Sequence, residues 1–165
     1  MQSMEEMYQQ YSNTVYKYLL CLCQNAEIAE DLTQETFVIA LKKIHQFRGE
    51  CKVSTWLCQI AKHLWYKELR KTKKAVTEVL TDEMVALEMT EDVVFQKDEK
   101  LQLFKNMQKL EEPARQVMYL RIMGNLNFIE IAEVLGKTSN WARVTFFRAK
   151  QKMRGEKENG KENRM

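Results

Sequence analysis

Proline occurs once and glycine five times among the 165 residues, and this scarcity is the strongest constraint on what the chain can fold into. These two residues interrupt helices and mark many turns, so long segments remain in which a helix can propagate without a break. Charged residues make up 30% of the sequence, which suits the outer faces of amphipathic helices. We therefore expect an all-α protein.

The N-terminus is acidic and polar, and no stretch approaches the ~20 apolar residues that a membrane-spanning helix needs, so we expect a soluble cytoplasmic protein without membrane insertion. Disulfides are rare in the cytosol, and the cysteines form no C-x-x-C pair. We expect no metal and buried or unreactive thiols, although zinc ligation with His45 or His63 stays open despite poor spacing. The four cysteines are Cys21, Cys23, Cys51 and Cys58.

The net charge of +3 hides an alternation along the chain. Residues 1–41 carry six acids and one lysine, whereas residues 42–74 carry ten bases and two acids. Residues 75–100 carry eight acids and two lysines, and residues 137–154 carry six bases and no acid. Two basic blocks separated by an acidic stretch suggest two surfaces that meet one polyanion. The alternative is that both blocks are only solvated helix faces.

The same pattern predicts two small helical domains, residues 1–72 and 98–155. The acidic stretch between them, residues 73–97, lacks a sustained apolar period, and we expect it to be a flexible linker. Residues 156–165 are poor in apolar residues, and we expect them to form a disordered tail.

The second domain carries start and stop signals for three helices. Pro113 suits the first turn of a helix, and Gly124 suits its left-handed end. Asn127 can cap the next helix with Glu130 in capping-box position, and that short helix ends at Gly136. Thr138 or Ser139 then caps a third, basic helix that starts near Asn140. A short helix, a turn that begins with glycine and a longer basic helix predict a helix-turn-helix.

Helical spacing divides the basic helix into two faces. The apolar stripe comprises Ala142, Phe146, Ala149 and Met153. The basic face comprises Arg143, Phe147, Lys150 and Arg154. Phe146 is therefore predicted to lie in the core and Phe147 to face outward among cations, where it could contact bases or sugars in a major groove. The alternative is that Phe147 packs on the other domain or on the tail.

The segment 25–44 also separates its apolar and acidic residues on a predicted helix. Its core stripe comprises Ile28, Ala29, Leu32, Thr36, Ala40 and Ile44. Its second face carries Glu27, Asp31 and Glu35, with Gln34 between turns. Such a face is usually only solvated, and the alternative is a docking surface for a basic or polar partner.

A glycine-centred loop, residues 47–54, leads into a basic helix that begins near Thr55. The aromatic residues of this helix are Trp56, His63, Trp65 and Tyr66, and its cations are Lys62, Lys67, Arg70 and Lys71. Aromatic rings among cations suit unstacked bases, because a ring stacks on any base while the cations follow the phosphates. The alternative places Trp56 and at least one of Trp65 and Tyr66 in the core.

Three blocks in this order and spacing, AEDLTQETF, FRGECKVSTWLCQIAKHLWYKELRK and LEEPARQVMYLRIMGNLNFIEIAEVLG…RAK, resemble one family. It is the bacterial RNA polymerase sigma factors of the extracytoplasmic-function (ECF) type. The resemblance covers both predicted domains, about three-quarters of the chain. Like that type, the chain has only a linker where larger sigma factors have a middle domain.

The resemblance implies a protein that binds core RNA polymerase, directs it to promoter DNA and helps to open the duplex, without a catalytic site, small-molecule substrate or cofactor. It also implies regulation by an anti-sigma factor, which is often linked to the membrane.

Family roles carry over to three groups of residues. The residues implied to bind core polymerase are Asp31, Gln34, Glu35 and Phe37. The residues implied to read the minus-ten element are Phe47, Arg48, Gly49, Cys58, Lys62 and His63. The residues implied to read the minus-thirty-five element are Asn140, Trp141, Arg143, Phe147, Arg148 and Lys150. His63 stands where some relatives have asparagine, Cys58 stands where tyrosine is frequent, and the start of the last helix departs from the common family sequence, so no base preference carries over.

Two other functions fit parts of the sequence. A stand-alone DNA-binding regulator accounts for the helix-turn-helix but leaves the acidic face and the aromatic basic helix unexplained. An enzyme that acts on nucleic acid needs clustered carboxylates, a phosphate-binding glycine loop or a His/Cys site, and the sequence shows none of these.

Overall fold

The computed structural model describes residues 2–75 and 98–162. Within these ranges the chain forms seven α-helices and one short 3₁₀ helix, which confirms the all-α prediction. The chain divides into two compact units, Met1–Val93 and Val94–Met165. The predicted linker, residues 73–97, lies outside the described residues except for its first three, which continue a helix.

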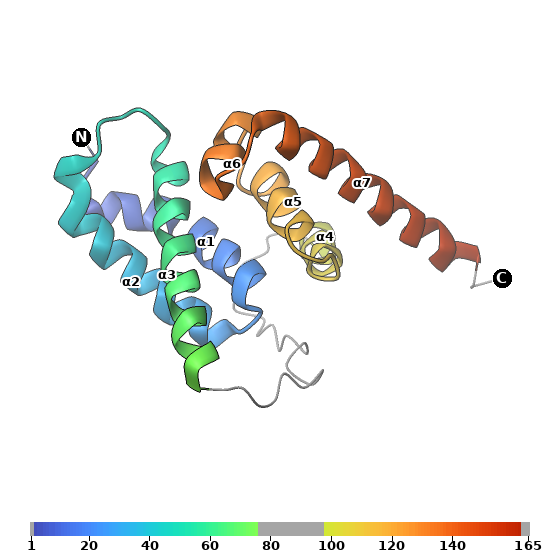
Figure 1. Cartoon of the computed structure of the whole chain (residues 1–165), viewed down its shortest axis with the longest axis horizontal. Coiled ribbons are helices and arrows are strands. Elements are labelled where there is room, and N and C mark those ends of the chain that lie inside the picture. Colours follow the sequence, from blue (N-terminus) through green and yellow to red (C-terminus); the bar gives the residue numbers. More distant parts are fainter. Residues whose placement is uncertain (1, 76–97, 163–165) are drawn as a thin grey trace. The chain divides into compact units, whose positions relative to one another are not determined.

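The N-terminal unit is a bundle of three helices, α1 (Met4–Cys23), α2 (Ala26–Lys43) and α3 (Val53–Ala75), with the short helix η1 (Ile44–Gln46) after α2 (Figure 1). Each of the three α-helices packs against the other two. Local caps position the first two helices. Ser3 and Glu6 form a capping box at the start of α1, and the Asn25 side chain accepts a hydrogen bond from the Ile28 backbone N–H at the start of α2.

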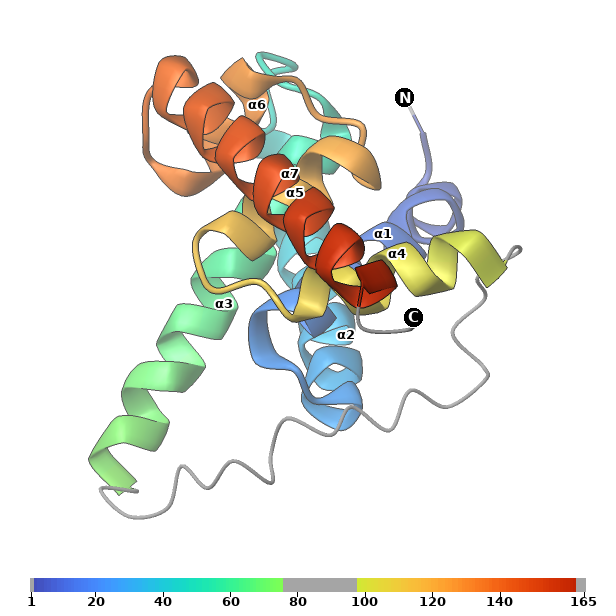
Figure 2. The same ribbon diagram turned by 90° about the vertical axis from the view of Figure 1, so that its right-hand side faces the viewer.

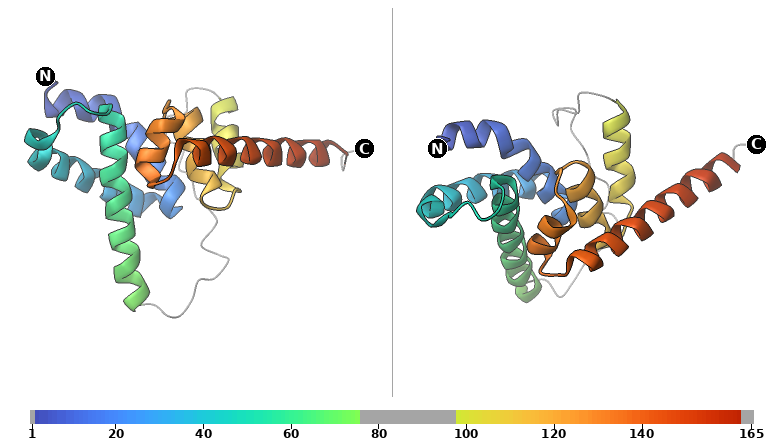
Figure 3. Two further views of the ribbon diagram at one scale, coloured as in Figure 1. Left: turned by 45° about the horizontal axis from the view of Figure 1, so that its top comes forward. Right: turned by 90° about the horizontal axis from the view of Figure 1, so that it is seen from above.

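Helix α3 is buried in its first half and exposed in its second. Leu57, Cys58, Ala61 and Leu64 are buried, whereas residues 66–68 and 70–72 are exposed. Figures 2 and 3 show the C-terminal half of α3 extending beyond α1 and α2. The second half of the basic helix predicted from the sequence therefore exposes its cations to solvent.

The C-terminal unit contains α4 (Asp98–Gln108), α5 (Ala114–Ile122), α6 (Phe128–Leu135) and α7 (Ser139–Glu162). Helix α5 lies at its centre, in contact with α4, α6 and α7, and α6 also packs on α7 (Figure 1). The rings of Phe104 and Tyr119, both fully buried, meet edge to face with centroids 6.1 Å apart. This packing is the core on which the pair α6–α7 rests.

The predicted caps of the helix-turn-helix are confirmed. The Asn127 side chain accepts a hydrogen bond from the Glu130 backbone N–H at 2.9 Å, and the Glu130 carboxylate accepts one from the Asn127 N–H at 3.1 Å. Helix α6 ends at Gly136, whose φ is 66°. The Thr138 hydroxyl then accepts a hydrogen bond from the Trp141 N–H, so Thr138 caps α7.

Gly124 has a different role from the predicted one. The left-handed residue after α5 is Asn125, with φ 55°, and asparagine tolerates this conformation better than most residues. Gly124 instead allows close packing, because a Cβ there would lie 2.8 Å from the Leu120 carbonyl oxygen and 3.2 Å from the Leu120 Cα. Both atoms belong to the backbone and cannot rotate away.

Gly124→Ala is therefore expected to destabilise the C-terminal unit by about 1–3 kcal/mol through overpacking. Gly155→Ala is the matched control, because no atom lies within 4 Å of its added Cβ and the residue is in helix α7. That change should stabilise the unit by up to about 1 kcal/mol through better helix propensity. Urea unfolding of the two full-length variants measures both effects, and equal effects of the same sign would contradict the contact at Leu120.

The disordered tail expected for residues 156–165 is corrected by the structure. Helix α7 continues through Glu162, and residues 163–165 lie outside the described residues. Lysine and glutamate dominate this segment and favour helices. Extending an existing helix also avoids the cost of nucleating a new one, which low apolar content alone does not reveal.

Candidate nucleic-acid and partner interfaces

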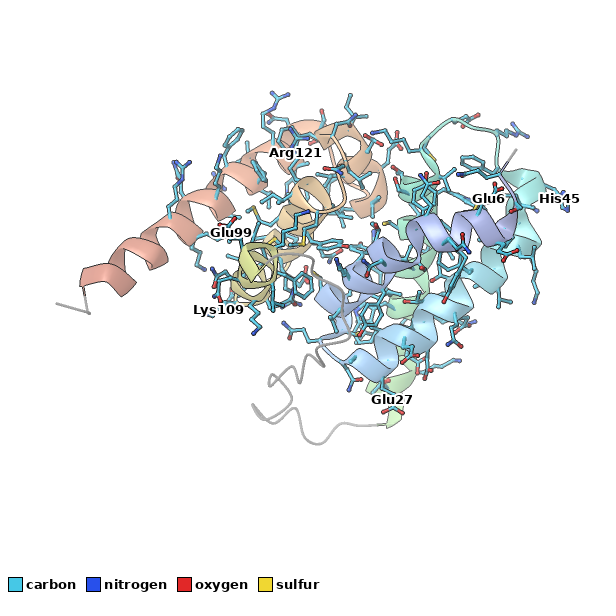
Figure 4. The ribbon with its side chains drawn as sticks, turned by 180° about the vertical axis from the view of Figure 1, so that it is seen from behind. Glu6, Glu27, His45, Glu99, Lys109 and Arg121 are labelled. Atoms are coloured by element: carbon cyan, nitrogen blue, oxygen red, sulfur yellow. The ribbon has the colours of Figure 1, made fainter. Side chains whose placement is uncertain are left out.

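The outward face of α2 carries the acidic ridge, which we define as Glu27, Asp31, Gln34 and Glu35. All four side chains are exposed. Glu27 lies near the start of α2, and His45 follows its end (Figure 4). The opposite face of the helix is buried, with the hydroxyl of Thr36 donating a hydrogen bond to the Leu32 carbonyl. The ridge is thus held on a helix whose other side is fixed in the core.

Two findings change the predicted boundary of this face. Phe37 is only 6% exposed, and its ring lies 4.9 Å from that of Tyr8, so it joins α2 to α1 and offers no free surface to a partner. Val38 and Leu41, which the sequence reasoning missed, are 51% and 56% exposed. They lie four and seven residues after Gln34, so the outward face continues from acidic into apolar residues. Both residues are apolar but lie outside the predicted core stripe, and this position in the sequence could have indicated that they are exposed.

The loop between η1 and α3 contains a cavity of about 160 Å³. Its lining residues are Gln46, Phe47, Arg48, Glu50, Cys51 and Trp56. The rings of Phe47 and Trp56 lie 4.9 Å apart at an interplanar angle of 35°, which gives the cavity an aromatic wall. Gly49 takes a left-handed φ of 74°, which turns the loop back toward α3. Phe47 and Arg48 therefore line the cavity, and Gly49 belongs to the loop that carries them.

Lys62 and His63 lie further along α3. The Lys62 ammonium lies 5.5 Å from the Tyr66 ring centroid, and His63 is exposed. His63 follows Trp56 by seven residues, so the two share one face of the helix, about 10 Å apart along its axis. The cavity and His63 can therefore meet successive parts of one extended ligand.

Cys58 does not belong to this face, which corrects the expectation that its side chain is available to a base. The residue is 1% exposed, and burial raises the pKa of its thiol to about 12. At neutral pH it is an uncharged thiol in the core of the three-helix bundle. Trp56, by contrast, is half-buried and lines the cavity, although the sequence left a purely core role open.

The exposed face of α7 follows the predicted division closely. Phe146 is 9% exposed and Phe147 is 50% exposed, and Ala142 and Ala149 are buried beside Phe146. The predicted contact residues that are exposed are Asn140, Arg143, Phe147 and Arg148. The α7 face is therefore rich in cations, with one projecting aromatic ring.

Trp141 and Lys150 are only half-exposed. The Lys137 ammonium lies 5.6 Å from the Trp141 ring centroid and partly covers it. Lys150 lies at the edge of the face, because its side chain lines a cavity of about 300 Å³ between α7 and the helices α4 and α5. The other lining residues are Leu103, Asn106, Lys109, Met118, Ile122, Met153 and Arg154.

Sequence reasoning missed two residues beside the α7 face, Arg121 and Phe128. Arg121 lies at the end of α5 (Figure 4), and its guanidinium carbon lies 4.9 Å from the Phe128 ring centroid. Phe128 also neighbours Phe146 and Phe147. No short-range pattern signals these contacts, since they join three helices.

The cysteines and histidines form no centre of their own within the part of the chain that the structure describes. No group of three or more His, Cys, Asp or Glu side chains is placed there to hold a metal ion. None of the four cysteines, all of which lie in the described ranges, forms a disulfide. Over the same ranges, no helix is both long and apolar enough to cross a membrane.

Comparison with known sequences identifies relatives over nearly the whole chain. Residues 7–75 match the family model described as Sigma-70 region 2. The chain is 32% identical over 158 residues to the RNA polymerase sigma factor YlaC of Bacillus subtilis, covering 92% of this chain and 90% of that protein. It is 30% identical over 155 residues to the ECF RNA polymerase sigma factor SigM of Bacillus subtilis, covering 92% and 93%.

Comparison with solved structures identifies the same fold at lower sequence identity. The sigma factor RpoE of Bartonella quintana, solved in complex with the anti-sigma factor NepR, aligns with a TM-score of 0.69 at 16% identity and covers 92% of this chain and 94% of that one. CnrH, solved in complex with the cytosolic domain of CnrY, aligns with a TM-score of 0.65 at 16% identity and covers 94% and 88%.

Proposed function

Because the chain belongs to the family of ECF RNA polymerase sigma factors, we propose that its acidic ridge, its loop cavity with α3, and its α7 face perform the three tasks of such a protein. The protein binds core RNA polymerase and directs it to specific promoters, where transcription starts. The observation that carries this function is the identity of 30–32% to two sigma factors over at least nine-tenths of both sequences, which includes both helical units.

The acidic ridge on α2 binds the core polymerase. Asp31, Gln34 and Glu35 offer carboxylates and an amide to a basic or polar surface, and the exposed Val38 and Leu41 extend the contact with apolar area. Interfaces that combine a desolvated apolar centre with polar groups at the rim are common. Phe37 supports the ridge without touching the polymerase, because its ring packs α2 against α1.

The loop cavity and the exposed face of α3 bind the single-stranded minus-ten element. The Phe47–Trp56 wall provides a surface on which a flipped base can stack, while Arg48 and Lys62 follow the phosphates. His63 meets a neighbouring nucleotide. Flipping a base from the duplex costs a few kcal/mol, which stacking and polar contacts in the cavity offset.

The α7 face binds the minus-thirty-five element in the major groove. Arg143 and Phe147 are exposed within the first nine residues of α7, and recognition helices use their N-terminal part to reach base edges. Arg148 contacts a phosphate. Asn140 and Trp141 lie at the edge of the DNA major groove. The half-exposed Lys150 contributes positive charge at the edge of the α7 face.

The protein acts in the cytoplasm, has no catalytic activity or cofactor of its own and is held inactive by an anti-sigma factor. Two relatives of the same fold have been solved with a partner of this kind or with a cytosolic domain of another protein. An anti-sigma factor that covers the acidic ridge or the α7 face would keep core polymerase or DNA from that surface.

Runoff transcription with purified core polymerase tests this function. The full-length protein should direct transcripts of defined length from its promoters, whereas core polymerase alone should give none. A stand-alone DNA-binding regulator would bind duplex DNA without core polymerase and would not start transcription. Absence of promoter-specific transcripts in the presence of active core polymerase would contradict the proposal.

A further inference from the structure

Three aromatic rings from α6 and α7 form a cluster beside the α7 face. The ring of Phe128 lies 5.6 Å from that of Phe146 and 6.4 Å from that of Phe147, and the last two rings lie 5.4 Å apart at an angle of 72°. Phe146 belongs to the core, Phe147 projects outward, and the exposure of Phe128 is intermediate between theirs. The cluster therefore connects the packed side of the helix-turn-helix with its exposed side.

Two arginines from different helices approach the Phe128 ring. The guanidinium carbon of Arg121, on α5, lies 4.9 Å from the ring centroid, and that of Arg143, on α7, lies 5.8 Å from it. The Arg121 Nη1 also donates a hydrogen bond to the Leu126 carbonyl at 3.3 Å. A guanidinium within about 6 Å of a ring centroid is attracted by the negative charge of the ring face. One ring thus holds two exposed cations near one another.

We propose that Phe128 is a positioning residue for sequence recognition and that Arg121 is an additional DNA contact. This inference rests on the proposed function of the α7 face. The Phe128 ring keeps the Arg143 guanidinium close to the orientation that it needs at a base edge. An exposed arginine samples many rotamers, and loss of this freedom opposes binding, so a side chain held in advance binds more tightly and more selectively.

The two arginines differ in what they can read. Arg143 is the fifth residue of α7, in the part of a recognition helix that meets base edges, and arginine pairs with guanine through two hydrogen bonds. Arg121 belongs to α5 and is tied to the Leu126 carbonyl, so it lies outside the recognition helix. Its charge therefore meets a phosphate, which improves affinity without reading sequence.

The test uses holoenzyme, reassembled from core polymerase and full-length variants, and a library of promoter duplexes. Wild-type holoenzyme first selects from duplexes randomised in both promoter elements. The selected minus-ten element is then fixed, and each variant selects again from duplexes randomised only in the upstream element. Sequencing of bound and unbound fractions gives the preference at every position.

Phe128→Leu should reduce the preference at the base pair read by Arg143 by about two- to five-fold, the effect of one exposed cation–π contact. Phe128→Met serves as a second variant without a ring. Phe128→Tyr keeps the ring and should retain the wild-type preference. In the Arg143→Ala background, Phe128→Leu should cause no further loss at that position.

Arg121→Ala should weaken binding to all duplexes alike and reduce the slope of log affinity against log salt by about one.

A merely structural role for Phe128 predicts other results. Wild-type preference in the folded Leu and Met variants, an equal loss in the Tyr variant, or a loss spread evenly over all upstream positions would each overturn the positioning role. An unchanged salt slope in Arg121→Ala would overturn the phosphate contact. If wild-type holoenzyme itself enriches no upstream sequence, the proposed function of the α7 face fails instead.

Discussion

Replacement of Phe146 by alanine is expected to destabilise the C-terminal unit by about 3–5 kcal/mol. The side chain is 9% exposed and lies on the same stripe as Ala142 and Ala149, which are too small to fill the space that it leaves. The substitution also removes the ring contacts of Phe146 with Phe128 and Phe147. Small domains have a total stability of about 5–15 kcal/mol, so the unit should lose much of its protection. Hydrogen exchange of the amides in α5, α6 and α7 measures the loss within the full chain.

Phe147→Ala is the matched control in the adjacent position. Because Phe147 is 50% exposed, its removal should change stability by no more than about 0.5 kcal/mol. It should instead reduce transcription from promoters that depend on the upstream element. If Phe147→Ala removes protection from exchange while Phe146→Ala does not, the rotation of α7 about its axis is wrong and so are its groove-facing residues.

The double substitution of Asp31→Lys with Glu35→Lys should strongly weaken assembly with core polymerase. The two carboxylates are four residues apart on the exposed side of α2, and they are spaced for one basic or polar partner. Truncating one member of a desolvated charge pair costs about 2–5 kcal/mol, and reversal adds repulsion, so affinity should fall by about 30-fold or more. Competition for core polymerase against a labelled wild-type protein measures this loss.

A control for net charge is the pair Glu99→Lys with Glu133→Lys. These two acids are also exposed, and the substitutions change the charge by the same amount, but they lie on α4 and α6. Far-ultraviolet circular dichroism should show wild-type helix content in both double variants, because all four side chains point to solvent. Wild-type affinity of the Asp31/Glu35 variant for core polymerase would remove the acidic ridge from the docking surface.

Much of the candidate site follows from spacing along single helices. The different roles of Phe146 and Phe147, the capping box at Asn127 and Glu130 and the cap at Thr138 depend on residues no more than four positions apart. The acidic ridge follows from the same rule. Helical geometry alone places such residues relative to one another, so no knowledge of packing is needed.

Other residues could not be placed in this way. Cys58, Phe37 and Lys150 were predicted to contact partners, yet Cys58 and Phe37 are buried and Lys150 lines a cavity shared with α4 and α5. A periodic pattern states which residues share a face but not how wide the buried sector is. That width depends on how neighbouring helices pack, and α2 and α3 are each covered by two other helices.

The sequence by itself determined the all-α class, the caps of the helix-turn-helix and the acidic and basic faces, because these depend on residues close in the chain. Its family motifs indicated the function. Only the tertiary structure showed that the Phe128 ring contacts both Arg121 and Arg143, and that Trp56 and Phe47 line one cavity. It also showed that the Leu120 backbone leaves no room for a Cβ at position 124. Such contacts follow from the packing of whole helices, in which shifts of a few ångströms exchange one neighbour for another.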